Sequence, residues 1–148
     1  IVNQYIPILN QSVNYYLQSL NSPIRFNIDK NLEVRLDSRY PGEFTYHSLS
    51  MGERQRIDLS MSFAWRRLAG IKNSVNTNLL ILDETFDASI DGDGTDDLLA
   101  ILDDIHRHGV NIFVISHKGG LEDKLRATIR IDKQNGFSKI TKEIQNHN

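Results

Sequence analysis

Three short stretches of this sequence carry side chains that could act together on a phosphate-containing ligand. They are Leu49-Ser50-Met51-Gly52-Glu53-Arg54-Gln55-Arg56, the apolar run 79–82 followed by Asp83-Glu84, and Val114-Ile115-Ser116-His117. The first offers a hydroxyl and backbone amides, the second a pair of carboxylates, and the third an imidazole. Each stretch alone has an ordinary structural explanation, so their order and spacing decide what they mean together.

The pair Asp83-Glu84 ends an apolar run that is typical of a buried strand. In parallel α/β sheets, ligands gather at the carboxyl ends of the strands. A carboxylate there can hold Mg²⁺, usually through water, and a neighbouring Glu can polarise a water for attack on a γ-phosphate. The pattern also fits a strand that simply ends in two solvated acids.

Ser50 and Glu53 have the spacing of a capping box at the start of a helix, which explains both residues without a ligand. The same geometry can bind an anion, because a helix N-terminus offers free amides and Gly52 lets the backbone approach closely. Arg54 and Arg56 place cations at the positive end of the helix dipole, which is unfavourable. We therefore expect Arg54, Gln55 and Arg56 to make contacts outside the helix, to nucleotide, DNA or a second protomer.

His117 follows a strand that we expect to neighbour the strand of Asp83. Both would then open onto one crevice, where an imidazole can donate a hydrogen bond to a γ-phosphate and sense its loss. A lone His after a strand is more often an ordinary loop residue, and the sequence pattern alone leaves both interpretations open.

The elements before these motifs are predicted from apolar spacing. Residues 2–20 have the four-three spacing of an amphipathic helix or of the end of a coiled coil, and the shortness of the repeat favours the helix, with Pro7 starting or kinking it. Segments 24–29 and 32–37 predict a hairpin, and 39–47 a loop. A helix should run from Ser50 to Gly70, with Phe63 and Trp65 in the core.

The second half alternates strands and helices. Segments 79–82 and 110–115 predict strands buried on both faces, joined by a helix from Gly94 to a C-cap at Gly109. A short helix at 121–126 and strands at 128–132 and 137–141 complete the chain. This pattern predicts an α/β fold with a mainly parallel sheet and flanking helices, preceded by a helix and a β-hairpin.

Composition sets outer limits on the function. The 148 residues suit one domain, 1–148, and a formal net charge of −2 gives no overall field that favours nucleic acid or a membrane surface. There are no cysteines for disulfides or thiolate zinc sites, and no apolar run of membrane-spanning length. Nine acids and no Lys or Arg lie between Asn73 and Ile105, which suits a cation site or a solvated helix face.

The motifs together resemble those of ABC-type ATPases. Leu49-Ser50-Met51-Gly52-Glu53 resembles the signature motif, 79–84 the Walker B strand with its catalytic Glu, Ser89-Ile90-Asp91 the D-loop, and His117 the switch histidine. The run Gly52 to Arg56 is more similar to the SMC-type ATPases of DNA repair than to transporters. The greatest likeness is to the SbcC family and its tailed-phage branch, the ATPase subunits of recombination exonucleases, and it covers the whole chain.

This resemblance implies the C-terminal lobe of an ATPase head, with residues 1–20 continuing from an upstream coiled coil. It implies ATP and Mg²⁺ as ligands, with Asp83 holding the metal, Glu84 as general base and His117 as γ-phosphate sensor. Nucleotide contacts would come from the signature and D-loop residues, namely Ser50, Gly52, Glu53, Arg54, Ser89 and Asp91. The implied partners are an N-terminal Walker A lobe of the same polypeptide, a second head, an SbcD-like nuclease subunit and DNA, in the cytoplasm (the host's, if a phage encodes the protein).

The sequence departs from the family pattern in several places. The phosphate-binding Gly-x-x-x-x-Gly-Lys-Ser/Thr motif does not occur in these residues, so the isolated chain should hydrolyse little ATP. Met51 replaces a common Gly, Thr85 a common Pro, and one extra residue separates Glu84 from Asp91. Two other functions remain open, a transporter nucleotide-binding domain and a non-catalytic head that only dimerises or binds DNA.

Several other patterns receive structural explanations. Segment 87–92 imitates the start of an EF-hand loop, but Leu98 occupies the twelfth position, so we reject a calcium site. His106 and His108 are expected to be partners of a helix dipole. Six cations could contact DNA phosphates or could form a solvated face, and they are Arg66, Arg67, Lys118, Lys124, Arg126 and Arg130.

Overall fold

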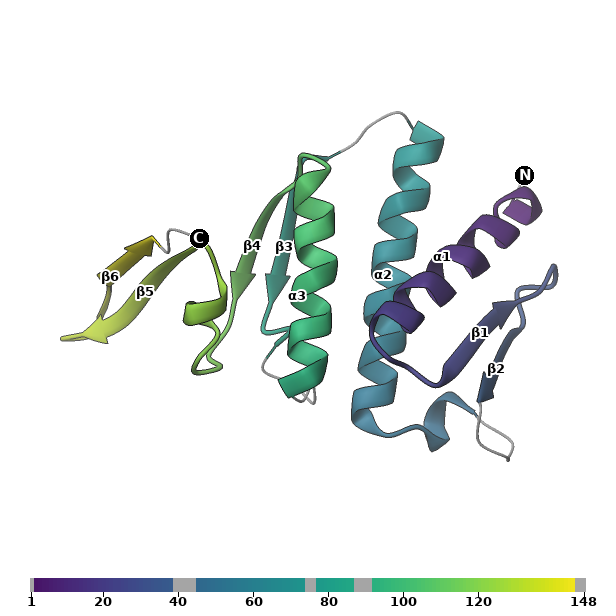
Figure 1. Cartoon of the computed structure of the whole chain (residues 1–148), viewed down its shortest axis with the longest axis horizontal. Helices are drawn as coiled ribbons and strands as arrows, with labels where there is room; N and C mark the ends of the chain where they lie inside the picture. Colours follow the sequence, from purple (N-terminus) through teal and green to yellow (C-terminus); the bar gives the residue numbers. More distant parts are fainter. Residues whose placement is uncertain (1, 39–44, 74–76, 87–91, 146–148) are drawn as a thin grey trace. The chain divides into compact units, whose positions relative to one another are not determined.

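A computed structural model describes residues 2–38, 45–73, 77–86 and 92–145 of the chain. The chain divides into two compact units, Ile1–Ser116 and His117–Asn148, which are described separately. The first contains three α-helices and two pairs of strands, and the second a single hairpin (Figure 1). The predicted α/β class is confirmed, and the parallel sheet consists of two strands within the described residues.

The chain opens with a 3₁₀ turn, η1 (Val2–Gln4), and helix α1 (Ile6–Ser19), which begins at Pro7 as predicted. Strands β1 (Ile24–Ile28) and β2 (Val34–Ser38) form the predicted antiparallel hairpin. The polar turn between them is held by the Asp29 carboxylate, which accepts the amide of Asn31 at 2.8 Å and of Glu33 at 3.0 Å.

A 3₁₀ turn, η2 (Tyr46–Ser48), leads into helix α2 (Met51–Asn73), which packs against α1 (Figure 1). The helix runs past Gly70, so the predicted end there is wrong, because one glycine costs a helix only about 1 kcal/mol. Phe63 is buried as predicted, but Trp65 is 52% exposed. Trp65 lies two residues further round the helix, so its side chain lies outside the core.

One hydrophobic core joins α1, β1 and the start of α2. Its buried members are Leu9, Val13, Leu17, Ile24, Phe26, Leu49, Ile57 and Ala64. Two α1 asparagines close the outer edge of β1 beside this core. Asn14 accepts the Phe26 amide at 2.9 Å and donates to its carbonyl at 2.6 Å, and Asn10 does the same for Ile28 at 2.9 Å each. Helix side chains thus stand where a third strand would pair.

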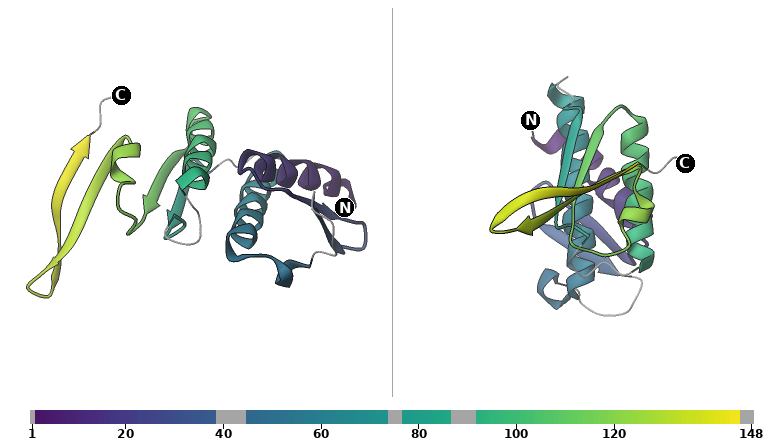
Figure 2. Two further views of the ribbon diagram at one scale, coloured as in Figure 1. Left: turned by 60° about the horizontal axis from the view of Figure 1, so that its bottom comes forward. Right: turned by 90° about the vertical axis from the view of Figure 1, so that its left-hand side faces the viewer.

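Strands β3 (Leu79–Asp83) and β4 (Asn111–Ile115) pair in parallel, with Asp83 opposite Ile115. Helix α3 (Gly92–Arg107) connects them and lies beside the pair (Figures 1 and 2). The predicted burial on both faces is wrong within this chain, because one face stays open. Its side chains are 46–59% exposed, namely Leu79, Ile81, Phe113 and Ile115.

The end of α3 matches the predicted pattern. Gly109 adopts a left-handed conformation with φ of +86°, as a helix C-cap requires. Nδ1 of His106 bonds to the carbonyl of Val110 at 2.9 Å, and Nδ1 of His108 to that of Asp104 at 2.7 Å. Both histidines therefore donate to carbonyl groups at the negative end of the helix.

The second unit consists of a 3₁₀ turn, η3 (Glu122–Lys124), and the antiparallel strands β5 (Ala127–Gln134) and β6 (Phe137–Gln145). The predicted short helix is therefore a single turn, and both strands are longer than predicted. The pairing is irregular between Arg130 and Ile131, where a β-bulge shifts the register.

Candidate nucleotide site

The first turn of α2 has the capping geometry that the sequence predicts. The Ser50 amide and hydroxyl both donate to Oε2 of Glu53, at 2.8 and 2.7 Å, and the Glu53 amide donates to Oγ of Ser50 at 3.3 Å. The hydroxyl bond, followed by the backbone bond, lowers the pKa of Glu53 below its ordinary value of 4.5. The Glu53 side chain is therefore a carboxylate at neutral pH.

Asp83 and Glu84 lie exposed at the carboxyl end of β3. Glu84 has a left-handed backbone, with φ of +52°, which non-glycine residues seldom adopt. Its amide donates to the carbonyl of Ile115, the last residue of β4, at 2.8 Å. Such backbone strain clusters at functional sites and persists where neighbouring groups hold it. Here the neighbouring strand fixes the base of the Glu84 side chain.

The polar run after Gly52 does contact groups outside the helix, but the partners differ from those predicted. Nε2 of Gln55 donates to the carbonyl of Thr85 at 2.8 Å, and Nε of Arg56 donates to the carbonyl of Leu20 at 3.1 Å. Both contacts lie within this chain rather than with nucleotide, DNA or a second protomer. The unusual polarity of this turn was the available signal, and its partners depend on the tertiary fold.

Comparisons with known proteins agree with this arrangement. Exonuclease subunit 2 of Enterobacteria phage T4 is 37% identical over 118 residues, which are 80% of this chain and 21% of that protein. Its counterpart from Escherichia phage RB69 is 32% identical over 141 residues, or 95% of this chain and 25% of that protein. An SbcC protein of the nuclease SbcCD, from Rhodobacter capsulatus, is 26% identical over 133 residues, covering 88% and 10%. No protein-family model matches the sequence.

Solved structures show the same fold. An SMC ATPase structure superposes with a TM-score of 0.76 at 14% identity, covering 96% of this chain and 86% of that one. The SMC head domain from Thermotoga maritima superposes with a TM-score of 0.65 at 20% identity, covering 99% and 50%. The chain is an SMC/SbcC-like head lobe. It spans about a fifth to a quarter of the length of the phage relatives.

The head lobe offers a donor set that suits Mg²⁺. Mg²⁺ is usually held by one or two carboxylates together with water and substrate phosphates, and Asp83 provides an exposed carboxylate at the sheet edge. Among the described residues there is no cluster of three or more His, Asp or Glu side chains that would form a complete protein cage for a metal. The residues thus fit a metal that arrives with a nucleotide.

The remaining predicted site residues are placed only in part. Gly52 and Arg54 lie half-buried in the first turn of α2, and Nε of Arg54 is buried with no partner among the described residues. His117 is exposed and is the first residue of the second unit. Ser89 and Asp91 lie outside the described residues, so the D-loop assignment stays a prediction.

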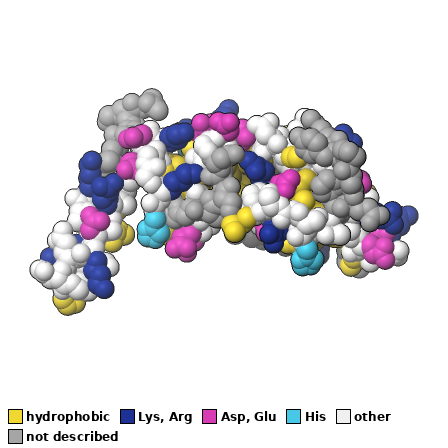
Figure 3. Space-filling model, turned by 90° about the horizontal axis from the view of Figure 1, so that it is seen from below, with side chains coloured by type: hydrophobic (Ala, Val, Ile, Leu, Met, Phe, Trp, Pro, Cys, Tyr) yellow, Lys and Arg dark blue, Asp and Glu magenta, His cyan; other side chains and the backbone are white. Residues whose placement is uncertain are grey.

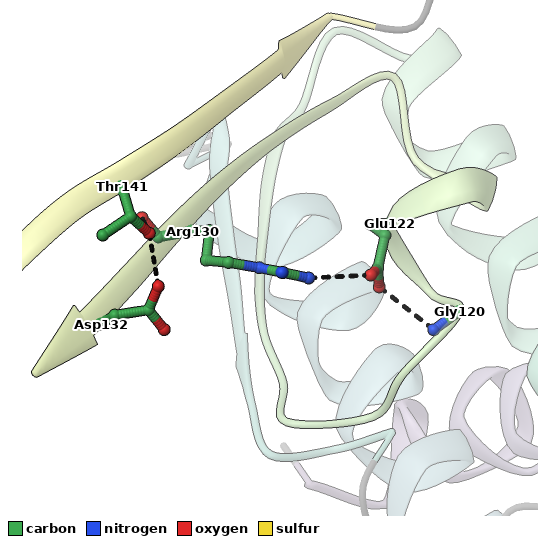
Figure 4. Close-up of polar contacts among 5 residues, drawn as sticks. All are labelled: Gly120, Glu122, Arg130, Asp132 and Thr141. Carbon is green, nitrogen blue, oxygen red and sulfur yellow. Dashed lines mark hydrogen bonds and ion pairs between the residues drawn. The ribbon is translucent and has the colours of Figure 1, made fainter.

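Two of the six candidate DNA-binding cations have partners within the head lobe. Arg66 of α2 donates to the Thr77 carbonyl at 2.5 Å and to that of Leu79 at 3.1 Å, which ties α2 to the start of β3. Arg130 of β5 pairs with Glu122 at 3.0 Å (Figure 4). On the face drawn in Figure 3, acidic and basic side chains are interspersed. No helix in the described residues is long and apolar enough to cross a membrane.

Proposed function

We propose that this head lobe takes part in ATP binding and hydrolysis within a DNA-repair or recombination exonuclease complex. The observation that carries the proposal is the strained backbone of Glu84, held by Ile115 directly after the exposed Asp83. The signature-like first turn of α2 supports it independently. The names of the phage relatives, which are exonuclease subunits, favour this complex over a transporter.

In the proposed reaction, Glu84 accepts a proton from the water that attacks the γ-phosphate. Asp83 holds Mg²⁺ through water, and the ion, when bound, neutralises charge on the phosphates. His117 donates a hydrogen bond to the γ-phosphate and senses its loss. Asp91 and Ser89 belong to a D-loop at the interface between two heads.

Ser50 and Gly52 would meet the γ-phosphate of the nucleotide held by a second head. The Ser50 hydroxyl donates to Glu53 at 2.7 Å in this structure, so it must turn away from that carboxylate to donate to a phosphate. The first-turn amides need no such change, because a helix N-terminus leaves them without helical partners. Glu53 still holds the Ser50 backbone while the hydroxyl turns.

The open face of β3–β4 supports the proposed partner within the polypeptide. Four apolar side chains are about half exposed there, an arrangement that a further layer of protein would cover. We propose that the N-terminal Walker A lobe provides this layer and the main phosphate cradle. A second head, an SbcD-like nuclease subunit and DNA complete the proposed assembly, with no membrane partner.

The test is ATP hydrolysis by the complete head, in which this chain is joined to its Walker A lobe. Glu84→Gln should lower kcat by about 100-fold or more, because a positioned general base contributes about 10²–10⁴-fold. Asp83→Asn should raise the Mg²⁺ concentration needed for half-maximal activity. Asp123→Asn, an exposed acid in the second unit, is the control and should change neither value. Normal turnover by Glu84→Gln would refute the proposed base.

A further inference from the structure

We propose that Gln55 is a positioning residue for Glu84, an inference that rests on the proposed function of that carboxylate. Gln55 lies one turn into α2 and carries no role in the reaction proposed for this head. Its side chain nevertheless reaches the turn that follows the catalytic strand, where Nε2 donates to the carbonyl of Thr85 at 2.8 Å. This bond links residues that lie 30 positions apart in the sequence.

The turn after β3 is held at three successive residues. The Glu84 amide is bound by the carbonyl of Ile115, the Thr85 carbonyl by Gln55, and Phe86 is fully buried with 0% exposure. Two of these anchors lie on β4 and in the core. Gln55 is the anchor that comes from the signature-like helix.

The chemistry of the amide supports a positional role. A carbonyl only accepts hydrogen bonds, so the Gln55 atom facing Thr85 must be the nitrogen. The other end of the amide, Oε1, is buried and has no partner among the described residues. Leaving a buried acceptor unpaired costs free energy, so this side chain is a poor choice for stability alone. What it supplies is a fixed distance between α2 and the carbonyl next to Glu84.

The bond joins two parts of the proposed machinery. The start of α2 carries Ser50 and Gly52, which in the proposed dimer serve the nucleotide of the second head. The Thr85 turn carries Glu84, which serves the nucleotide of its own head. A shift of the α2 N-terminus therefore acts directly on the backbone next to the base, through a single hydrogen bond.

The experiment compares Gln55→Met with wild type in the full-length protein, since Met keeps the length of the side chain and removes the donor. We expect kcat for ATP to fall by about ten-fold to a hundred-fold, which is typical of a misplaced catalytic group, with KM changed less than about two-fold. Amide hydrogen exchange should speed up at residues 84–86 and stay unchanged in the rest of α2. Gln11→Met, an exposed position on α1, is the matched control and should match wild type in both measurements.

The outcomes separate this inference from the proposed function. If Gln55→Met keeps normal kcat while Glu84→Gln is inactive, the positioning role is wrong and the base assignment stands. A lowered kcat without faster exchange at residues 84–86 would also overturn the inference, because Gln55 would then act elsewhere. If Glu84→Gln itself turns over normally, the proposed function fails first.

Discussion

The two strand pairs of the first unit differ in how completely this chain finishes them. The β1–β2 hairpin has its inner face in the core, and its β1 edge is closed by the amides of Asn10 and Asn14. The β3–β4 pair has α3 beside it, while apolar side chains such as Ile81 and Phe113 stay more than half exposed. Both pairs are built from similar aliphatic residues.

The difference shows which region depends on further protein. The hairpin satisfies its backbone and its apolar surface with side chains of its own helix, so it needs no additional layer. The parallel pair carries the Asp83-Glu84 carboxylates but leaves one of its faces uncovered. The proposed catalytic edge thus lies on the incomplete part of the molecule, and the helix that resembles the signature motif lies on the complete part.

The largest expected effect comes from matched truncations in the two regions. Leu17→Ala, at 1% exposure in the core, should lower the free energy of unfolding by about 2–5 kcal/mol. Leu79→Ala, at 46% exposure on the open face, should cost less than about 1 kcal/mol in the isolated chain, because little surface is reburied. Urea denaturation measures both. Equal costs would contradict the distinction between a finished and an unfinished region.

The edge of β1 gives an intermediate effect. Asn14→Leu removes the partners of both backbone groups of Phe26, so we expect a loss of about 1–3 kcal/mol in unfolding free energy. Gln18→Leu, an exposed change on the same helix, should leave stability nearly unchanged. An Asn14→Leu protein as stable as wild type would show that the helix amides do not close the edge.

The smallest effect is the pH dependence of the α2 cap. Because the Ser50 hydroxyl and amide lower the pKa of Glu53, its contribution is complete above pH 4.5 and is lost as the pH falls through the lowered value. Glu53→Gln cannot titrate there, so wild type should lose stability relative to it on acidification, by less than about 1 kcal/mol. Thermal unfolding between about pH 3 and 7 tests this, and parallel pH profiles would contradict it.

Much of the fold could be predicted because local signals agree with tertiary packing. The hairpin, the capping box at Ser50 and the C-cap at Gly109 all depend on a few neighbouring residues. The predicted pairing of the strands that end in Asp83 and Ile115 is likewise confirmed, since a crossover helix joins them. The family resemblance is confirmed by sequence and fold.

The predictions that are wrong concern burial and long-range contacts. Apolar runs at 79–82 and 110–115 indicate two buried faces, but burial depends on layers that local sequence does not describe. The Gln55–Thr85 bond spans 30 residues, and no spacing rule identifies such a partner. The strained backbone of Glu84 likewise arises from the position of β4, which only the folded chain provides.

The most direct test of the proposed function asks whether this lobe forms half of an ATP-dependent head. The chain would be combined with its Walker A lobe, and the mass followed by light scattering with and without ATP and Mg²⁺, for wild type and for Glu84→Gln. We expect ATP to double the mass of the complex, and Glu84→Gln to hold that dimer because the nucleotide is no longer hydrolysed. A mass that ATP leaves unchanged in both proteins would contradict the proposal of two heads closing on ATP.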